Sequence, residues 1–251
     1  MSTPIETVDF VKKDYLTIGQ LASNLGWSVR FIEGLVRAER LPGLEINGAW
    51  HFRRDDVIDW LEQKIQTLDT SRVLELEKRV ETSLVADGTY RRAVATDRIT
   101  TRIPEQGIAL DVDLTNKTDV LKALVNLAEK SGLVYDHDYL LTSLVDRERL
   151  SSTAMPGGVA LCHPRRPEPI AISTQFVCVL KTAKPVAFGA ADGKGTSVFF
   201  LLCAPDDRSH LYSLARVARI LHHGALPGIL AAKSDSEVRN AITAIENLIG
   251  D

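Results

Sequence analysis

Apolar residues in the first part of the chain recur at helical spacing in two short segments. The first segment predicts a helix over 18–25, with an apolar face made of Ile18, Leu21, Ala22 and Leu25. The second predicts a helix over 29–39, with an apolar face made of Val29, Ile32, Leu35 and Val36. Thr17 and Ser28 are the expected N-caps, because a hydroxyl accepts from the free N–H groups of a first helical turn. Since only residues 26–28, Gly-Trp-Ser, separate the helices, the pattern is typical of a helix-turn-helix.

The next segment predicts a hairpin and a third helix. Asn47-Gly48 lies between apolar runs, and these two residue types accept the positive φ angles of a two-residue hairpin turn. A helix is then predicted from Asp55 to about Gln66, with Val57, Ile58, Trp60 and Leu61 as its apolar residues. A helix-turn-helix followed by a hairpin and a helix is the layout of a winged helix, which we place at 14–66.

Residues 67–97 predict a helical connector that ends in a linker. Apolar residues recur there every three or four positions, as in a short coiled coil: Val73, Leu76, Val80 and Leu84. This stripe predicts either a homodimer or packing against one of the two neighbouring domains. The Asp87-Gly88 break and the polar run at 89–98 indicate a flexible linker.

Strands and helices alternate over 98–251. Apolar and β-branched runs predict buried strands at Ala171–Leu180 and Ser197–Cys203, and a short strand ahead of His163. One helix is predicted to begin at Asn116 or Thr118 and to end at Gly132. Three further helices are predicted at Asp136–Asp146, Ser209–His223 and Asp235–Ile249. This alternation predicts an α/β domain whose mixed sheet is covered by helices.

Composition narrows the class of protein. The chain has 251 residues, enough for two domains, and a net charge of −3, so a nucleic-acid partner requires a local basic patch. Its three cysteines, Cys162, Cys178 and Cys203, form no C-x-x-C pair, which argues against a disulfide framework or a structural zinc site. No signal peptide and no apolar run long enough to span a membrane are recognisable, so we expect a cytoplasmic location and no membrane partner.

The segment from Asp146 to Arg165 holds the strongest candidate chemistry. His163 follows an apolar run, and small or hydroxylated residues precede that run: Ser151, Ser152, Thr153, Gly157 and Gly158. An imidazole at the mouth of a strand suits the transient holding of a phosphoryl group, because its neutral ring nitrogen is a nucleophile. Backbone N–H groups and Arg147 offset the charge of the transferred oxygens.

This segment resembles the enzyme IIA domain of the bacterial phosphotransferase system, in the fructose/mannitol and nitrogen-regulatory class. The residues in register with the family pattern are Arg147, Glu148, Ser152, Thr153, Gly158, Val159, Ala160, Leu161 and His163. Two later segments also match, through Pro185, Phe188, Asp192, Val198, Phe200, Pro205 and His210. The sequence departs from the family pattern at Cys162, where proline is usual, and at Pro164, where glycine is common.

The resemblance implies that a histidine phosphocarrier protein delivers a phosphoryl group to His163. Arg147 would pair with the phosphoryl oxygens, and His210 would hydrogen-bond the phosphate or set the tautomer of His163. Ser152, Thr153 and Gly158 would belong to the phosphate loop. The chain would then be an enzyme, a phosphotransferase with a phosphohistidine intermediate. The alternatives are a structural role for His163 and a surface position for His210.

The N-terminal unit resembles excisionase/MerR-like DNA-binding modules. The matching residues are Thr17, Gln20, Leu21, Ala22, Leu25, Gly26, Ser28, Phe52, Arg53, Asp56, Val57, Trp60 and Leu61. The candidate DNA contacts are Arg30, Arg37 and Arg40 on or just past the second helix, and His51, Arg53 and Arg54 on the wing. The alternative is a solvated face of a protein-interaction domain, because Glu33, Glu39 and Glu45 dilute the positive field.

These observations predict a cytoplasmic bacterial regulator that accepts a phosphoryl group on His163 and couples this to DNA binding. Its expected partners are the histidine phosphocarrier protein and DNA, and neither a cofactor nor a metal is expected. Two alternatives stay open: a IIA-like sensor or docking module that has lost phosphotransfer, and a soluble IIA component of a sugar phosphotransferase system.

Overall fold

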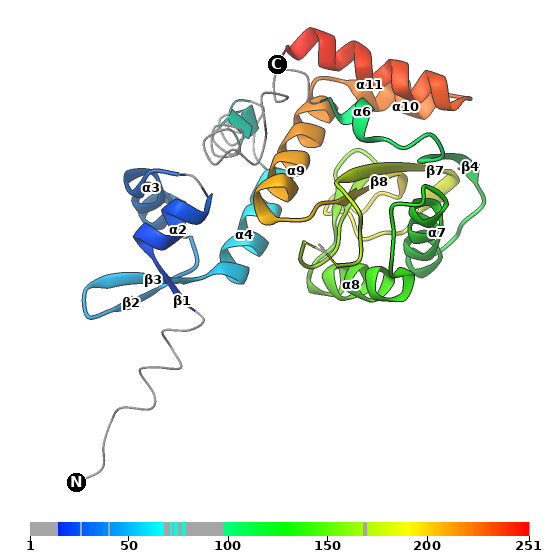
Figure 1. The fold of residues 1–251 in the computed structure, drawn as a ribbon. Helices are drawn as coiled ribbons and strands as arrows, with labels where there is room; N and C mark the ends of the chain where they lie inside the picture. Colours follow the sequence, from blue (N-terminus) through cyan, green and yellow to red (C-terminus); the bar gives the residue numbers. More distant parts are fainter. Residues whose placement is uncertain are drawn as a thin grey trace. The chain divides into compact units, whose positions relative to one another are not determined.

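The computed structural model describes residues 15–25, 27–39, 41–67, 71, 73–74, 77–78, 98–167 and 170–250 (Figure 1). Contacts between Cα atoms divide the chain into two units, Met1–Arg92 and Ala93–Asp251. None of the described helices combines the length and apolarity that crossing a bilayer requires.

The first unit joins three helices to a small antiparallel sheet. Its elements are β1 (Tyr15–Thr17), α2 (Ile18–Leu25), α3 (Val29–Glu39), β2 (Leu44–Ile46), β3 (Ala49–Arg53) and α4 (Arg54–Thr67). The sheet order is β1-β3-β2, with both pairs antiparallel. The predicted helix-turn-helix, hairpin and third helix are therefore present, and the short strand β1 is an addition that the sequence pattern did not predict.

Local hydrogen bonds explain where these helices begin. The backbone N–H of Gln20 donates to Thr17 Oγ1 at 3.2 Å, and Gln20 Oε1 accepts from the Thr17 N–H at 2.8 Å, which forms a capping box. Ser28 Oγ accepts from the Phe31 N–H at 3.2 Å at the start of α3. At the wing, Asn47 and Gly48 have φ angles of 52° and 76°, as a two-residue hairpin turn requires.

Part of the predicted connector lies outside the described residues. Val73 is described and buried, whereas Leu76, Val80 and Leu84 of the heptad pattern, and the linker at 87–97, are not among the described residues. The coiled-coil prediction and the homodimer that it offers therefore stay predictions.

The second unit is an α/β domain with a five-stranded mixed sheet. Its strands are β4 (Ile108–Val112), β5 (Ala154–Met155), β6 (Val159–Cys162), β7 (Phe176–Val186) and β8 (Thr196–Cys203). Its helices are α6 (Ile99–Arg102), α7 (Lys117–Lys130), α8 (His137–Leu150), α9 (Asp207–His222), α10 (Ala225–Ala231) and α11 (Asp235–Ile249). The sheet order is β4-β7-β8-β6-β5; β4 runs parallel to β7 and β6 parallel to β8, and the other two pairs are antiparallel. The predicted fold class is confirmed.

Both faces of this sheet are covered, which is why its central strands read as continuous apolar runs. On one face, Cys178 and Leu180 of β7 and Leu201 of β8 pack in one cluster with residues of α7 and α8. The alternate residues of these strands, such as Val179 and Phe200, point to the opposite face and are also buried.

Several boundaries differ from the sequence prediction. Helix α8 continues to Leu150 instead of stopping at Asp146, so Arg147 lies on its last turn. Strand β7 begins at Phe176, and the predicted strand residues before it contribute only a bridge between Ile172 and Val134. The elements β5, α6 and α10 were not predicted, because each is shorter than the windows over which periodicity is legible.

Candidate phosphohistidine site and DNA interface

His163 lies at the end of the sheet where the parallel strands β6 and β8 have their carboxyl ends. It comes directly after β6, which runs parallel to β8 with Cys162 opposite Leu201. His210 lies in the first turn of α9, the helix that follows β8. Because the carboxyl ends of parallel strands meet at the same edge, the two histidines come together although they are far apart in sequence.

The two imidazole rings are in contact. Their centroids are 4.7 Å apart and the ring planes are inclined by 50°. Nδ1 of His163 lies 3.0 Å from the carbonyl oxygen of Pro164, and a carbonyl accepts only from a protonated nitrogen. The neutral ring therefore carries its proton on Nδ1 and its lone pair on Nε2. Nε2 is the nitrogen that this geometry prepares as a nucleophile.

Arg147 is held beside this position by the loop that follows α8. Its Nη1 donates to the carbonyl oxygen of Ser151 at 3.1 Å and to Ser151 Oγ at 3.4 Å. Strands β5 and β6 pair antiparallel with Ala154 opposite Ala160, and the Leu161 N–H donates to the Thr153 carbonyl oxygen at 3.1 Å. The segment that follows α8 therefore runs alongside β6, the strand that ends just before His163.

A buried carboxylate organises the loop before His163. Glu148 Oε2 accepts from the backbone N–H of Thr153 at 3.1 Å and from the Thr153 hydroxyl at 2.7 Å. Its other oxygen, Oε1, accepts from Lys117 Nζ at 2.8 Å. Lys117 did not stand out in the sequence because nothing there links it to a residue that lies 31 positions further along the chain.

The hydroxyls of Ser152 and Thr153 are engaged by protein acceptors. Ser152 Oγ donates to the carbonyl oxygen of Phe188 at 2.9 Å, and the Thr153 hydroxyl donates to Glu148. Each hydroxyl has one proton to donate. In this arrangement the two side chains fix the loop, and their assignment to the phosphate loop stays a prediction.

Gly158 and His163 lie at opposite ends of β6, and the assignment of Gly158 to the phosphate loop stays a prediction. It precedes β6 whereas His163 follows it, so a strand separates them by on the order of 15 Å. Gly157 and Gly158 have φ angles of 96° and 91°, and they form the turn between β5 and β6. The Asp192 carboxylate accepts from the Gly157 N–H at 3.3 Å and ties this turn down.

Cys162 is a buried thiol in the position where the family pattern has proline. Burial, with a smaller contribution from the negative charge of Glu148, raises its pKa to about 12. A thiol with this pKa stays protonated at neutral pH and is a poor nucleophile. Cys162 therefore offers no second nucleophile beside His163 at neutral pH.

The basic residues predicted to contact DNA lie on α3 and on the wing. Arg30 and Arg37 of α3 and Arg53 of β3 are exposed, and Arg54 begins α4. His51 of β3 is partly buried, with Nδ1 3.0 Å from the Ala49 carbonyl oxygen. Arg40 lies outside the described residues.

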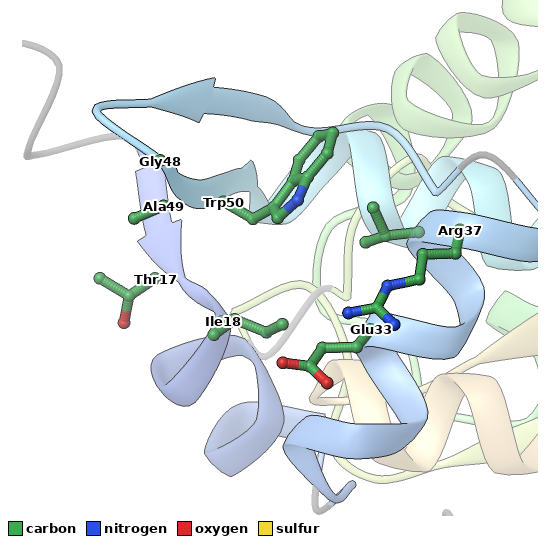
Figure 2. Close-up of a pocket in the computed structure, with 8 residues that line it drawn as sticks. Thr17, Ile18, Glu33, Arg37, Gly48, Ala49 and Trp50 are labelled. Atoms are coloured by element: carbon green, nitrogen blue, oxygen red, sulfur yellow. The ribbon is translucent and has the colours of Figure 1, made fainter.

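A hollow of about 230 Å³ separates α3 from the wing (Figure 2). Its lining residues are Thr17, Ile18, Glu33, Val36, Arg37, Gly48, Ala49 and Trp50. Glu33 and Arg37 project from α3 on one side, and Trp50 stands on β3 on the other. The unit therefore presents a concave surface between a helix and a hairpin.

Comparison with known proteins assigns both units. The family model of the phosphoenolpyruvate-dependent sugar phosphotransferase system, EIIA 2, matches residues 102–245. A helix-turn-helix domain model matches residues 15–65. The chain is 28% identical over 150 residues to a nitrogen regulatory protein of Bradyrhizobium diazoefficiens, a match that covers 59% of this chain and 95% of that protein. It is 26% identical over 150 residues to a fructose-specific EIIA component of Haloferax volcanii, with 59% and 96% coverage.

A solved structure shows the same fold. The nitrogen regulatory protein IIA-Ntr of Neisseria meningitidis is 26% identical, with a TM-score of 0.53, and the match covers 57% of this chain and 98% of that one. Because the family model matches more than half of the chain, the protein belongs to the EIIA type 2 family of the phosphoenolpyruvate-dependent sugar phosphotransferase system, and it carries an N-terminal helix-turn-helix domain.

Proposed function

We propose that this protein is a regulator that accepts a phosphoryl group on Nε2 of His163 and changes its DNA binding in response. The observation that carries the proposal is the tautomer of His163. The Pro164 carbonyl holds the Nδ1 proton and thereby leaves the Nε2 lone pair for attack. A structural histidine needs no such arrangement next to a second imidazole and an anchored arginine.

The donor would be a histidine phosphocarrier protein carrying a phosphorylated imidazole of its own. Nε2 of His163 attacks phosphorus, a P–N bond forms, and the P–N bond to the donor breaks in line on the opposite side. The donor ring recovers its electron pair, so the transfer needs no external acid, base or metal. In such a transfer the protein contributes mainly positioning and charge neutralisation.

Arg147 and His210 are the residues proposed to supply that neutralisation. A guanidinium presents several N–H donors in a plane that matches phosphoryl oxygens, and anchoring it to Ser151 fixes its position. His210, 4.7 Å from His163 between ring centroids, is close enough to donate to a phosphoryl group on the neighbouring ring. Removing either group should slow transfer without removing the nucleophile.

Intact-mass spectrometry tests the acceptance step. The full chain is mixed with phosphoenolpyruvate, enzyme I and the phosphocarrier protein, and its mass is recorded at neutral to alkaline pH. We expect one acid-labile phosphoryl group, absent from His163→Ala and present in His137→Ala, a matched variant of a histidine at the start of α8. A folded wild-type chain that gains no mass beside a working control acceptor would overturn the proposal.

The second part of the proposal is that the added charge reaches the DNA-binding unit. A phosphoryl group brings roughly two negative charges at neutral pH, enough to change how a charged surface docks. The support is the presence of both domains in one chain, matched at 15–65 and 102–245.

The departures from the family pattern at Cys162 and Pro164 are the reason to consider one other function, a IIA-like docking module without phosphotransfer. Cys162 is unreactive at neutral pH, and the Pro164 carbonyl oxygen accepts from Nδ1 of His163, so both residues are compatible with a His163 that accepts a phosphoryl group.

The relative named as a fructose-specific EIIA component supports a third function, handing the phosphoryl group on to a sugar transporter. Transfer of the phosphoryl group from this chain to a IIB acceptor would favour this third function.

A further inference from the structure

Gly34 leaves a gap in the side chains of the exposed face of α3. It lies in the middle of this helix, it is exposed, and a Cβ built on it would meet no atom within 4 Å. Glycine weakens a helix interior relative to alanine because its unfolded backbone has more freedom to lose. Neither packing nor a positive φ accounts for glycine at this position in the described structure.

Charged residues flank this gap along the helix. Arg30 lies one turn before Gly34 and Arg37 one turn after it, and all three are exposed. Glu33 projects toward the hollow between α3 and the wing, as does Arg37 (Figure 2). At Gly34 the helix backbone is uncovered, and the guanidinium groups of Arg30 and Arg37 on either side are hydrogen-bond donors. This arrangement suits a partner that approaches the helix closely and offers acceptors on both sides.

The base edges in the DNA major groove are such a partner. Arginine pairs with the acceptors of guanine there, and the exocyclic amino group of cytosine is the donor that a glutamate recognises. A carboxylate on the same face would repel a phosphate, so Glu33 points to a base edge and not to the DNA backbone.

We propose that Gly34 is where α3 lies closest to the floor of the DNA major groove, and that Glu33 beside it selects a cytosine. The proposal rests on the DNA binding proposed above and deepens it. It adds two residues to the arginines of α3 and states the class of site, a G·C-containing duplex read through the major groove.

Selection from a randomised duplex library tests this with the full chain at one fixed salt concentration. The wild type should enrich a motif that contains a cytosine, and Glu33→Gln should replace that cytosine by adenine, because glutamine pairs with adenine N6 and N7. Changing the cytosine in the selected duplex should weaken the wild type roughly 5- to 150-fold, and Glu33→Gln much less.

Gly34→Ala tests the close approach. It should raise the melting temperature of the N-terminal unit, yet lower affinity for every duplex by about tenfold or more, since the added methyl group stands between helix and bases. Gly19→Ala is the matched control, because Gly19 is also helical with no atom within 4 Å of its Cβ position, but lies on α2. It should leave both affinity and motif unchanged.

The outcomes separate the two levels of the proposal. A wild type that binds no duplex overturns the proposed DNA binding and this inference with it. A wild type that binds and selects a motif, with Glu33→Gln selecting the same motif or Gly34→Ala binding as tightly, overturns this inference alone. An equal loss of affinity in both alanine variants also contradicts it, because the effect would then not belong to the α3 face.

Discussion

At the scale of single residues, Glu148 is the buried acceptor that fixes the segment between α8 and β5. It takes two hydrogen bonds from Thr153 and an ion pair from Lys117, and its side chain is only 4% exposed. A carboxylate that collects three donors in a buried place fixes the segment between them. Glu148 lies between Arg147 and Ser151, in the last turn of α8, and the loop begins at Ser151.

We therefore expect Glu148→Ala to lower the free energy of unfolding by about 2 kcal/mol, since it leaves buried donors without their acceptor. Asp146→Ala is the control, because Asp146 pairs with Arg149 at side-chain exposures of 45% and 75%. An exposed pair of this kind should contribute less than about 0.5 kcal/mol. Urea unfolding of both variants measures the difference, and equal losses would contradict the role given to Glu148.

The burial of the cysteine thiols leads to a second prediction at the scale of single residues. Burial raises the pKa of both Cys162 and Cys178 to about 12, so neither should react with a thiol reagent at neutral pH in the folded protein. Because the pKa of Cys162 in the folded protein lies above the ordinary thiol value of 9.0, protonation of this thiol stabilises the folded state below pH 9, and this stabilisation is lost as the pH rises toward 12. Absorbance with a disulfide reagent should show labelling only after denaturation. Prompt labelling of the native chain at neutral pH would show that the thiols are accessible.

At the scale of elements, caps and turns decide where the helices and strands begin. Asn116, Asp136 and Ser234 accept from backbone N–H groups at the starts of α7, α8 and α11. The sequence predicted a helix start at Asn116 or Thr118 and helices from Asp136 and Asp235, but it did not single out Ser234 as a cap. The wing turn at Asn47-Gly48 was predicted from its two residue types.

The wing turn and helix α2 offer a paired test with one type of substitution. Gly48 has a φ of 76°, so Gly48→Ala should destabilise the N-terminal unit by about 1 kcal/mol. Gly19 is helical with open space at its Cβ position, so Gly19→Ala should stabilise the same unit by about 0.5 kcal/mol. Thermal unfolding followed by circular dichroism compares the two, and shifts in the same direction would refute the assignment of the turn.

Other boundaries could not be predicted, because local pattern was overruled by contacts made elsewhere. The sequence predicted that this helix ends at Asp146, yet α8 continues to Leu150, and Glu148 in its last turn accepts from Lys117 and Thr153. Gly158 was assigned to the phosphate loop through the family resemblance, and the extended strand β6 separates it from His163. The pairing of His163 with His210 needed the topology of β6 and β8, and only the family resemblance anticipated it.

At the scale of the whole molecule, two domains of different chemistry share one chain. We propose domain boundaries at 14–66, 67–97 and 98–251, supported by the units Met1–Arg92 and Ala93–Asp251 and by family matches at 15–65 and 102–245. One domain carries His163, the proposed phosphoryl acceptor, and the other presents arginines on a helix and a wing. The fusion serves regulation only if phosphorylation of the first domain alters DNA binding by the second.

The affinity of the full chain for its selected duplex, measured with and without enzymatic phosphorylation at the same salt concentration, tests this coupling most directly. We predict that the dissociation constant differs between the two forms by several fold, and that the difference disappears in His163→Ala, because the charge added to this histidine is its cause. Equal dissociation constants for a fully phosphorylated and an unphosphorylated chain would contradict the coupling and leave two independent domains joined by a connector.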